Sequence, residues 1–236
     1  MINQDEPKKR RHKKQQKRKS RQKSKKKENS MKLREVSNGL IHLIGLLFAI
    51  PFLGILLLHA QDVWQVVSFS IYGSMMILLY LCSVLYHWLP EPTIPVFRRF
   101  DHIMIYAFIA GTYTPFCLVT LNGAWGWSLF GVIWGIAVVA ISIQAVFIDL
   151  PRSITTLIYM LMGWICIIAL LPLYKLLPTF GFYLLVLGGL IYSVGGVIYA
   201  IKRPNIPHII GYHQIWHILV LFGSVAHAIC VLFFVQ

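Results

Sequence analysis

After its first 34 residues, the sequence is a succession of long apolar runs separated by short polar segments. Each run is about 20 residues long, the length that an α-helix needs to cross a hydrocarbon core of roughly 30 Å. The pattern predicts an all-α integral membrane protein with seven transmembrane helices. The predicted spans are residues 37–58, 65–88, 103–121, 127–148, 154–173, 181–201 and 212–235.

Glycines within two of these runs predict close packing between helices. Gly131 and Gly135 form a GxxxG pattern in the fourth run, and the sixth run carries four glycines between residues 188 and 196. Small residues allow the backbones of two membrane helices to approach closely. We therefore expect both runs to pack through their glycine faces.

The basic residues divide the chain into a tail and an apolar body. Residues 1–34 contain 16 of the 22 lysines and arginines. Residues 1–31 have almost nothing apolar to bury, so we predict a disordered tail followed by a membrane domain at residues 32–236. The tail could bind nucleic acid, lie on anionic lipid headgroups, or hold the N-terminus in the cytoplasm. It has no interleaved aromatic residues and no folded basic module, which favours the two membrane roles over specific nucleic-acid binding.

The basic residues outside the tail predict the orientation of the helices. When the runs are followed alternately, the residues on the side of the N-terminus are Arg98, Arg99, Arg152, Lys202 and Arg203. Lys175 is the only basic residue on the other side. The positive-inside rule then places the N-terminus in the cytoplasm and Gln236 outside, in a multi-pass protein of the plasma membrane. This orientation disfavours a G-protein-coupled receptor, and the lack of a lysine in the last run disfavours a retinal protein.

Ionisable residues inside the apolar runs are the candidate functional residues, because they are costly in a membrane. His213 and His217 are four residues apart at the start of the last run, so they share one helix face. Ser83 and His87 have the same spacing at the end of the second run. His87, His213 and His217 could supply three nitrogen ligands with a water as the fourth, which is the open arrangement of catalytic zinc.

Asp101 is the acidic residue expected at the same leaflet, at the start of the third helix together with His102. Its carboxylate could orient or deprotonate the water, and Ser83 could hydrogen-bond beside it. Asp101 could instead pair with Arg98 or Arg99, and His87 could be an interfacial residue.

The first run adds three polar residues to this leaflet. Glu35, Asn38 and His42 occupy positions i, i+3 and i+7, so they share a helix face. We interpret His42 and His102 as hydrogen-bonding residues between helices rather than as ligands. The opposite leaflet offers chiefly His59, Asp62 and His227. Of these, His227 lies ten residues beyond the histidine pair, roughly 15 Å along the helix, and is interpreted as a core histidine.

Three motifs make the chain similar to a known family. They are Glu35-x-x-Asn38-x-x-x-His42, Ser83-x-x-x-His87 with Asp101 after it, and His213-x-x-x-His217. On these motifs residues 32–236 resemble the hemolysin III family, within the progestin and adipoQ receptor superfamily, which is related to the alkaline ceramidases. The resemblance implies that the histidines of the last two motifs bind zinc near the cytoplasmic face. It also implies that the aspartate contacts the zinc-bound water.

Three functions remain open on the sequence. The first is a zinc-dependent hydrolase of a lipid amide or ester, with Asp101 as the base and Ser83 stabilising charge or orienting water. The second is a cytolysin or channel-like protein with a structural zinc, and the third is a non-catalytic regulator of membrane homeostasis. No run carries a polar stripe along its full length, so a pore would have to form between protomers. Membrane lipids are the expected partners in each case.

Overall fold

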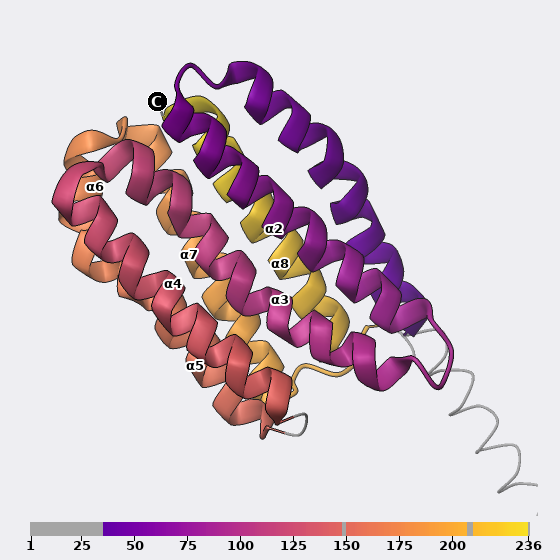
Figure 1. Cartoon of the computed structure of the whole chain (residues 1–236). Helices are drawn as coiled ribbons and strands as arrows, with labels where there is room; N and C mark the ends of the chain where they lie inside the picture. The colour runs from indigo at the N-terminus through magenta and orange to yellow at the C-terminus, as the bar shows by residue number, and fades with distance from the viewer. Residues whose placement is uncertain (1–34, 148–149, 207–209, 236) are drawn as a thin grey trace, which may run out of the picture.

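The computed structural model describes residues 35–147, 150–206 and 210–235, and their helices run side by side in a bundle (Figure 1). Within these residues, seven helical segments are long and apolar enough to cross a membrane. The predicted all-α fold with seven transmembrane helices is confirmed, whereas the basic tail of residues 1–31 lies outside the described residues. The first segment is Glu35–His59, followed by α2 (Val63–Trp88), α3 (Ile94–Pro115) with the π-helix η1 (Phe116–Leu121), α4 (Gly123–Val146), α5 (Arg152–Trp164) with the 3₁₀-helix η2 (Ile165–Ala169) and α6 (Leu170–Leu176), α7 (Thr179–Ile201) and α8 (Tyr212–Phe234).

Large apolar side chains cover the outer surface of the bundle. Leu58 is 85% exposed, and many leucines, isoleucines, valines and phenylalanines on the helix surfaces are more than half exposed. Such extensive apolar exposure is rare on soluble monomers and marks a surface that contacts protein or lipid. Inside the bundle, the Tyr72 ring stacks on Phe108 and meets Phe52 edge to face. The helices therefore bury an aromatic core and present a second apolar surface to the membrane.

The third helix begins nine residues earlier than the sequence predicted. It starts at Ile94 rather than at residue 103, so Asp101 lies two turns inside α3 instead of next to its start. Charged residues at positions 98, 99 and 101 lower the local hydropathy without breaking the helix. Pro95 is also compatible with the first helical turn, where its missing N–H is not needed. Hydropathy located the apolar part of this helix and missed its polar extension.

The fifth transmembrane segment, predicted at residues 154–173, spans Arg152–Leu176 and changes its helix type within that span. It consists of α5, the short 3₁₀ segment η2 and α6. Pro172 has no N–H to donate to the carbonyl of Ile168, and loss of this hydrogen bond disrupts a regular α-helix. The tighter 3₁₀ turns of η2 precede this proline, which explains why the irregularity lies there.

The predicted glycine packing occurs at three of the four predicted glycines of α7, the exception being Gly189, and it does not occur in α4. Gly188 packs directly against the ring of His227, and a Cβ atom at Gly196 would lie 2.6 Å from the sulfur of Met160. A Cβ atom at Gly131 or Gly135 would meet nothing within 4 Å among the described residues. The expectation of close packing through the GxxxG pattern is therefore wrong within this chain, because that face of α4 points away from the other described helices.

Successive transmembrane segments run in opposite directions, so the bundle has two common ends. One end, which we call the histidine end, contains the starts of the first helix, α3, α5 and α8 and the ends of α2, α4 and α7 (Figure 1). The other, the far end, includes the turn between the first helix and α2. Among the helices from α2 to α8, the most extensive contacts are between α2 and α3 and between α7 and α8. These pairs bring the end of α2 and the start of α3, both rich in polar residues, to the same place.

Candidate metal centre

The start of α8 places two histidines on one face. The Gly211 N–H donates to the side-chain oxygen of Gln214 at 2.7 Å, which satisfies one of the unpaired donors at a helix N-terminus. His213 and His217 follow in the first two turns of α8, and their ring centroids are 4.7 Å apart. The predicted i, i+4 pair is therefore present as two neighbouring imidazoles.

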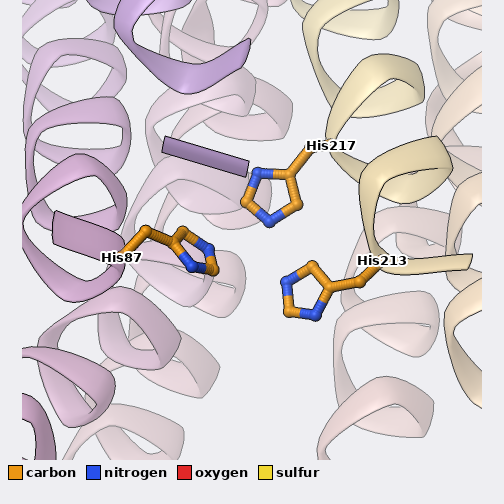
Figure 2. Close-up of side chains that lie close together, drawn as sticks. All are labelled: His87, His213 and His217. Carbon is orange, nitrogen blue, oxygen red and sulfur yellow. The ribbon is translucent and has the colours of Figure 1, made fainter. Parts of the chain in front are cut away.

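His87 approaches this pair from the last turn of α2. Its ring centroid lies 5.5 Å from that of His213 and 5.1 Å from that of His217. Figure 2 shows the three imidazoles pointing into a common space between α2 and α8. One ring nitrogen from each residue lies within 4.8 Å of the others. The structure thus brings together the three histidines that the sequence singled out.

The ring nitrogens of these histidines fit a metal ion. The Nε2 atoms of His87, His213 and His217 are buried and have no hydrogen-bond partner among the described residues. Leaving a buried polar atom unpaired costs about 1–3 kcal/mol, so three converging unpaired nitrogens indicate a ligand. Zinc takes imidazole nitrogens at about 2.0–2.1 Å, which places tetrahedral ligands about 3.4 Å apart. Small side-chain rotations would bring the three nitrogens to that spacing.

Asp101 and Ser83 lie beside the histidines and are buried. Ser83 is one turn before His87 on α2, and the Asp101 carboxylate is close enough to both for electrostatic interaction. The Ser83 hydroxyl is next to that carboxylate but is not in hydrogen-bonding geometry. A buried carboxylate and a hydroxyl therefore lie beside the three imidazoles.

The first helix contributes the third polar face. Asn38 and His42 are both 2% exposed, and the carboxylate oxygen Oε2 of Glu35 lies 2.7 Å from Nδ1 of His87. The ring centroid of His42 is 3.7 Å from that of His217. Neither ring nitrogen of His42 has a hydrogen-bond partner among the described residues, in contrast to the interface hydrogen bond that the sequence predicted. His42 instead packs as a fourth imidazole against the group.

The two histidines expected at the opposite leaflet are separate from this group. His59, at the end of the first helix, places Nδ1 2.9 Å from the carbonyl oxygen of Ile55. His227 is buried in α8 and places Nε2 3.0 Å from the carbonyl oxygen of Leu185. Each has a backbone partner, in agreement with the interpretation of His227 as a core histidine.

Sequence reasoning missed the aromatic and basic residues around His213. The Tyr199 ring meets His213 edge to face, with centroids 5.7 Å apart and planes at 90°. The Arg152 guanidinium lies 4.5 Å from the Tyr199 ring centroid and donates to the Tyr212 hydroxyl at 2.8 Å. Aromatic residues in apolar runs usually indicate core or lipid contact, so the sequence carried no signal for this arrangement.

A cavity of about 260 Å³ extends through the bundle from the neighbourhood of the histidines. Its lining includes His42 and Asp101 at the histidine end and Leu121 and Leu129 at the far end. Asp101 and Leu121 are separated by about 30 Å along the helix at 1.5 Å per residue. Most of the remaining lining surface is apolar, although it includes two threonines, a serine, four tyrosines and His227. The cavity forms between helices distant in sequence, so no local pattern could have predicted it.

Comparison with known proteins places the chain among proteins with a shared name. A family model described as Haemolysin-III related matches residues 31–228. Hemolysin-3 of Bacillus cereus is 42% identical over 205 residues, which cover 85% of this chain and 91% of that protein. The Hemolysin-3 homolog of Bacillus subtilis strain 168 is 43% identical over 204 residues, covering 85% of this chain and 93% of that protein.

A more distant similarity reaches animal proteins. The monocyte to macrophage differentiation factor of Homo sapiens is 26% identical over 182 residues, which cover 74% of each chain. None of the solved structures gives a significant match. The relationship to these proteins therefore rests on sequence similarity alone.

Proposed function

The chain belongs to the haemolysin-III related family, and from this premise we propose that it is a zinc-dependent hydrolase of a lipid amide or ester. The observation that carries the proposal is the convergence of three buried, unpaired imidazole nitrogens beside a buried carboxylate. His87, His213 and His217 would hold the zinc. When bound, zinc supplies a Lewis acid that polarises a carbonyl group and acidifies water.

Asp101 is proposed as the general base. Its carboxylate would accept a proton from the attacking water, whose oxygen forms a bond to the acyl carbon of the lipid. The C–N or C–O bond then breaks, and the same proton passes from Asp101 to the departing amine or alcohol. The products are a carboxylic acid and an amine or alcohol. Positioned acid and base groups of this kind contribute about 10²–10⁴-fold to rates.

Ser83 and the cavity support the same reaction. A rotation of the Ser83 hydroxyl toward Asp101 would give the carboxylate a hydrogen-bond donor and fix its orientation. The apolar cavity would hold the hydrocarbon chain of a lipid and exclude water from it. Because Asp101 is part of the cavity lining, a chain lying in the cavity would bring its polar end toward the carboxylate.

The charge pattern supports a place and an orientation for this chemistry. The chain is a multi-pass membrane protein, and we propose the plasma membrane with the N-terminus in the cytoplasm. The histidine end would then face the cytoplasmic leaflet, and the basic tail would meet anionic headgroups there. Specific nucleic-acid binding is not part of this proposal.

The names of the relatives favour a second candidate, a cytolysin or channel-like protein with a structural zinc. The mostly apolar lining surface of the cavity argues against a water-filled path through one chain. A lytic pore would therefore have to form between protomers. A non-catalytic regulator of membrane homeostasis would use the same zinc to hold the histidine end together.

Asp101→Asn separates the hydrolase from these alternatives. The purified protein would be loaded with zinc, reconstituted in liposomes, and given a long-chain ceramide and a phospholipid ester as probes. We expect fatty-acid release by the wild type and a loss of about 10²–10⁴-fold in the variant, which retains its zinc. Release that is absent from the zinc-loaded wild type, or undiminished in Asp101→Asn, would contradict the proposal. Equal leakage of a liposome dye from both proteins, without any lipid cleavage, would support the cytolysin.

A further inference from the structure

Glu35 makes a contact that its position in the sequence did not predict. Its carboxylate Oε2 lies 2.7 Å from Nδ1 of His87, across the interface between the first helix and α2. The side chain of His87 is 1% exposed and that of Glu35 is 55% exposed. A half-exposed acid therefore reaches inward to a buried imidazole of the candidate metal centre.

The chemistry of this contact fixes which ring nitrogen is free. An ionised carboxylate only accepts hydrogen bonds, so Nδ1 of His87 must carry the hydrogen and donate it. Nε2, the other ring nitrogen, is buried without a partner among the described residues. A hydrogen bond at one ring nitrogen selects the tautomer and sets the ring orientation of a metal-binding histidine. In this arrangement Nε2 has its lone pair available to a metal ion.

The packing around this contact holds the two helices at the required distance. The indole ring of Trp88 packs directly against Gly39, where a Cβ atom would have no room. The Trp88 indole N–H also donates to the carbonyl oxygen of Val36 at 3.4 Å. Both contacts fix the start of the first helix against the end of α2. The position of Glu35 over His87 is thus part of the helix packing.

We propose that Glu35 is a positioning residue of the metal centre. Its carboxylate holds the His87 ring with Nε2 directed toward His213 and His217, and it increases the basicity of that nitrogen. The inference rests on the proposed metal site and extends it from the three ligands to the first helix. Glu35 would then act in the metal centre although it is neither a metal ligand nor a catalytic residue.

An ion pair that only ties the first helix to α2 would behave differently. Its loss would lower the unfolding temperature of the metal-free protein and leave the zinc affinity of the folded protein unchanged. A positioning residue affects the zinc affinity, and an amide that accepts the same hydrogen bond partly replaces it. Zinc affinity and metal-free stability therefore separate the two roles without an activity assay.

The experiment compares Glu35→Ala, Glu35→Gln and the wild type as full chains in detergent. Each protein is stripped of metal, its unfolding temperature is recorded, and its zinc dissociation constant is measured by competition with a chelating dye. We expect Glu35→Ala to weaken zinc binding by about 10- to 100-fold. Glu35→Gln should lose less, because its side-chain oxygen accepts the Nδ1–H bond. The control is Glu91→Ala, which removes the same charge from an exposed position in the turn between α2 and α3 and should bind zinc like the wild type.

Two results would overturn the inference. One is a zinc dissociation constant of Glu35→Ala equal to that of the wild type. The other is a loss in Glu35→Gln as large as in Glu35→Ala, since the hydrogen bond would then be irrelevant. If Glu35→Ala did not fold, Glu35→Leu, which keeps a side chain of similar size but cannot accept the Nδ1–H bond, would replace it with the same expected loss and the same contradicting results. A wild type that binds no zinc would refute the proposed function itself. If the wild type and the Glu35 variants all bound zinc with equal affinity, only the role of Glu35 would be refuted.

Discussion

The two ends of the bundle treat their polar side chains in different ways. At the far end, Asp62 caps α2 by accepting the Gln65 N–H at 2.8 Å, and His59 pairs with the carbonyl oxygen of Ile55. At the histidine end, three imidazoles converge with their Nε2 atoms unpaired among the described residues. The same chain thus satisfies histidine locally at one end and leaves it available at the other.

Because both ends contain histidine, the converging unpaired nitrogens indicate a functional site more clearly than the presence of histidine does. Water is scarce inside a membrane protein, so buried polar groups normally find partners within the protein. His227, which is as buried as the site histidines, has a partner for Nε2, whereas its Nδ1 has none among the described residues. At the histidine end, by contrast, unpaired nitrogens from three residues lie together, and no partner among the described residues offsets their combined cost. A metal ion bound there, as proposed, would remove that cost.

The largest expected effect is the loss of metal on removing one site histidine. Replacement of His87, His213 or His217 by Ala should remove most of the zinc from purified protein, because two nitrogens bind far more weakly than three. His59→Ala and His227→Ala should keep the wild-type zinc content, measured by elemental analysis. Equal losses in both sets would erase the distinction between the two ends.

A smaller effect is expected from filling the cavity. Gly189 lines the cavity, and a Cβ atom there would meet nothing within 4 Å. Gly189→Leu should therefore occupy space needed by a hydrocarbon chain and reduce lipid turnover by about 10- to 200-fold, with zinc unchanged. Gly131→Leu is the matched control, because Gly131 also has free space but faces away from the bundle. Lipid turnover by Gly189→Leu at the wild-type rate would show that the cavity does not hold the hydrocarbon chain of the substrate.

Packing at the far end is expected to affect the stability of the protein and not its metal centre. A Cβ atom at Gly126 would collide with the backbone carbonyl of Cys117. Gly126→Ala should lower the free energy of unfolding by about 1–3 kcal/mol. Gly131→Ala on the same helix should instead raise it by up to about 1 kcal/mol. Denaturant titration in detergent measures both, and the zinc content of the folded protein should not change. Loss of zinc in folded Gly126→Ala would show that the ends are coupled.

The smallest effect is expected from deleting the basic tail, residues 2–30, which precedes the histidine end. The ligands and their neighbours all belong to the helices, so zinc content and unfolding temperature should equal those of the full chain. Binding of the purified protein to anionic vesicles should weaken, because each basic residue near such a surface contributes about 1 kcal/mol. A deletion that lost its zinc would show that the tail belongs to the metal centre.

The fold could be predicted from sequence wherever hydropathy alone decides. Seven apolar runs became seven transmembrane segments, and the i, i+4 spacing of His213 and His217 placed both imidazoles on one face. The predictions missed features that depend on properties other than hydropathy, such as charge and the missing N–H of proline. Charged residues at the start of α3 hid a helical extension. Hydropathy also gave no sign of the 3₁₀ turns that precede Pro172 in the fifth segment.

The site was predictable as a set of residues but not as a network. Helical spacing showed that Glu35, Asn38 and His42 share a face, yet it could not show which helix that face meets. The bond between Glu35 and His87 joins residues 52 positions apart, and the cavity is lined by several helices. Such relations depend on tertiary packing, which periodicity along one helix does not encode.

The most direct test of the central claim is the metal itself in the wild-type protein. Protein purified without chelators should contain about one zinc per chain, and X-ray absorption at the zinc edge should show three imidazole nitrogens at about 2.0–2.1 Å. The same spectrum from His59→Ala should be unchanged. A wild type without bound metal, or a zinc ion surrounded by fewer than three imidazoles, would contradict the account. The converging histidines would then be packing residues.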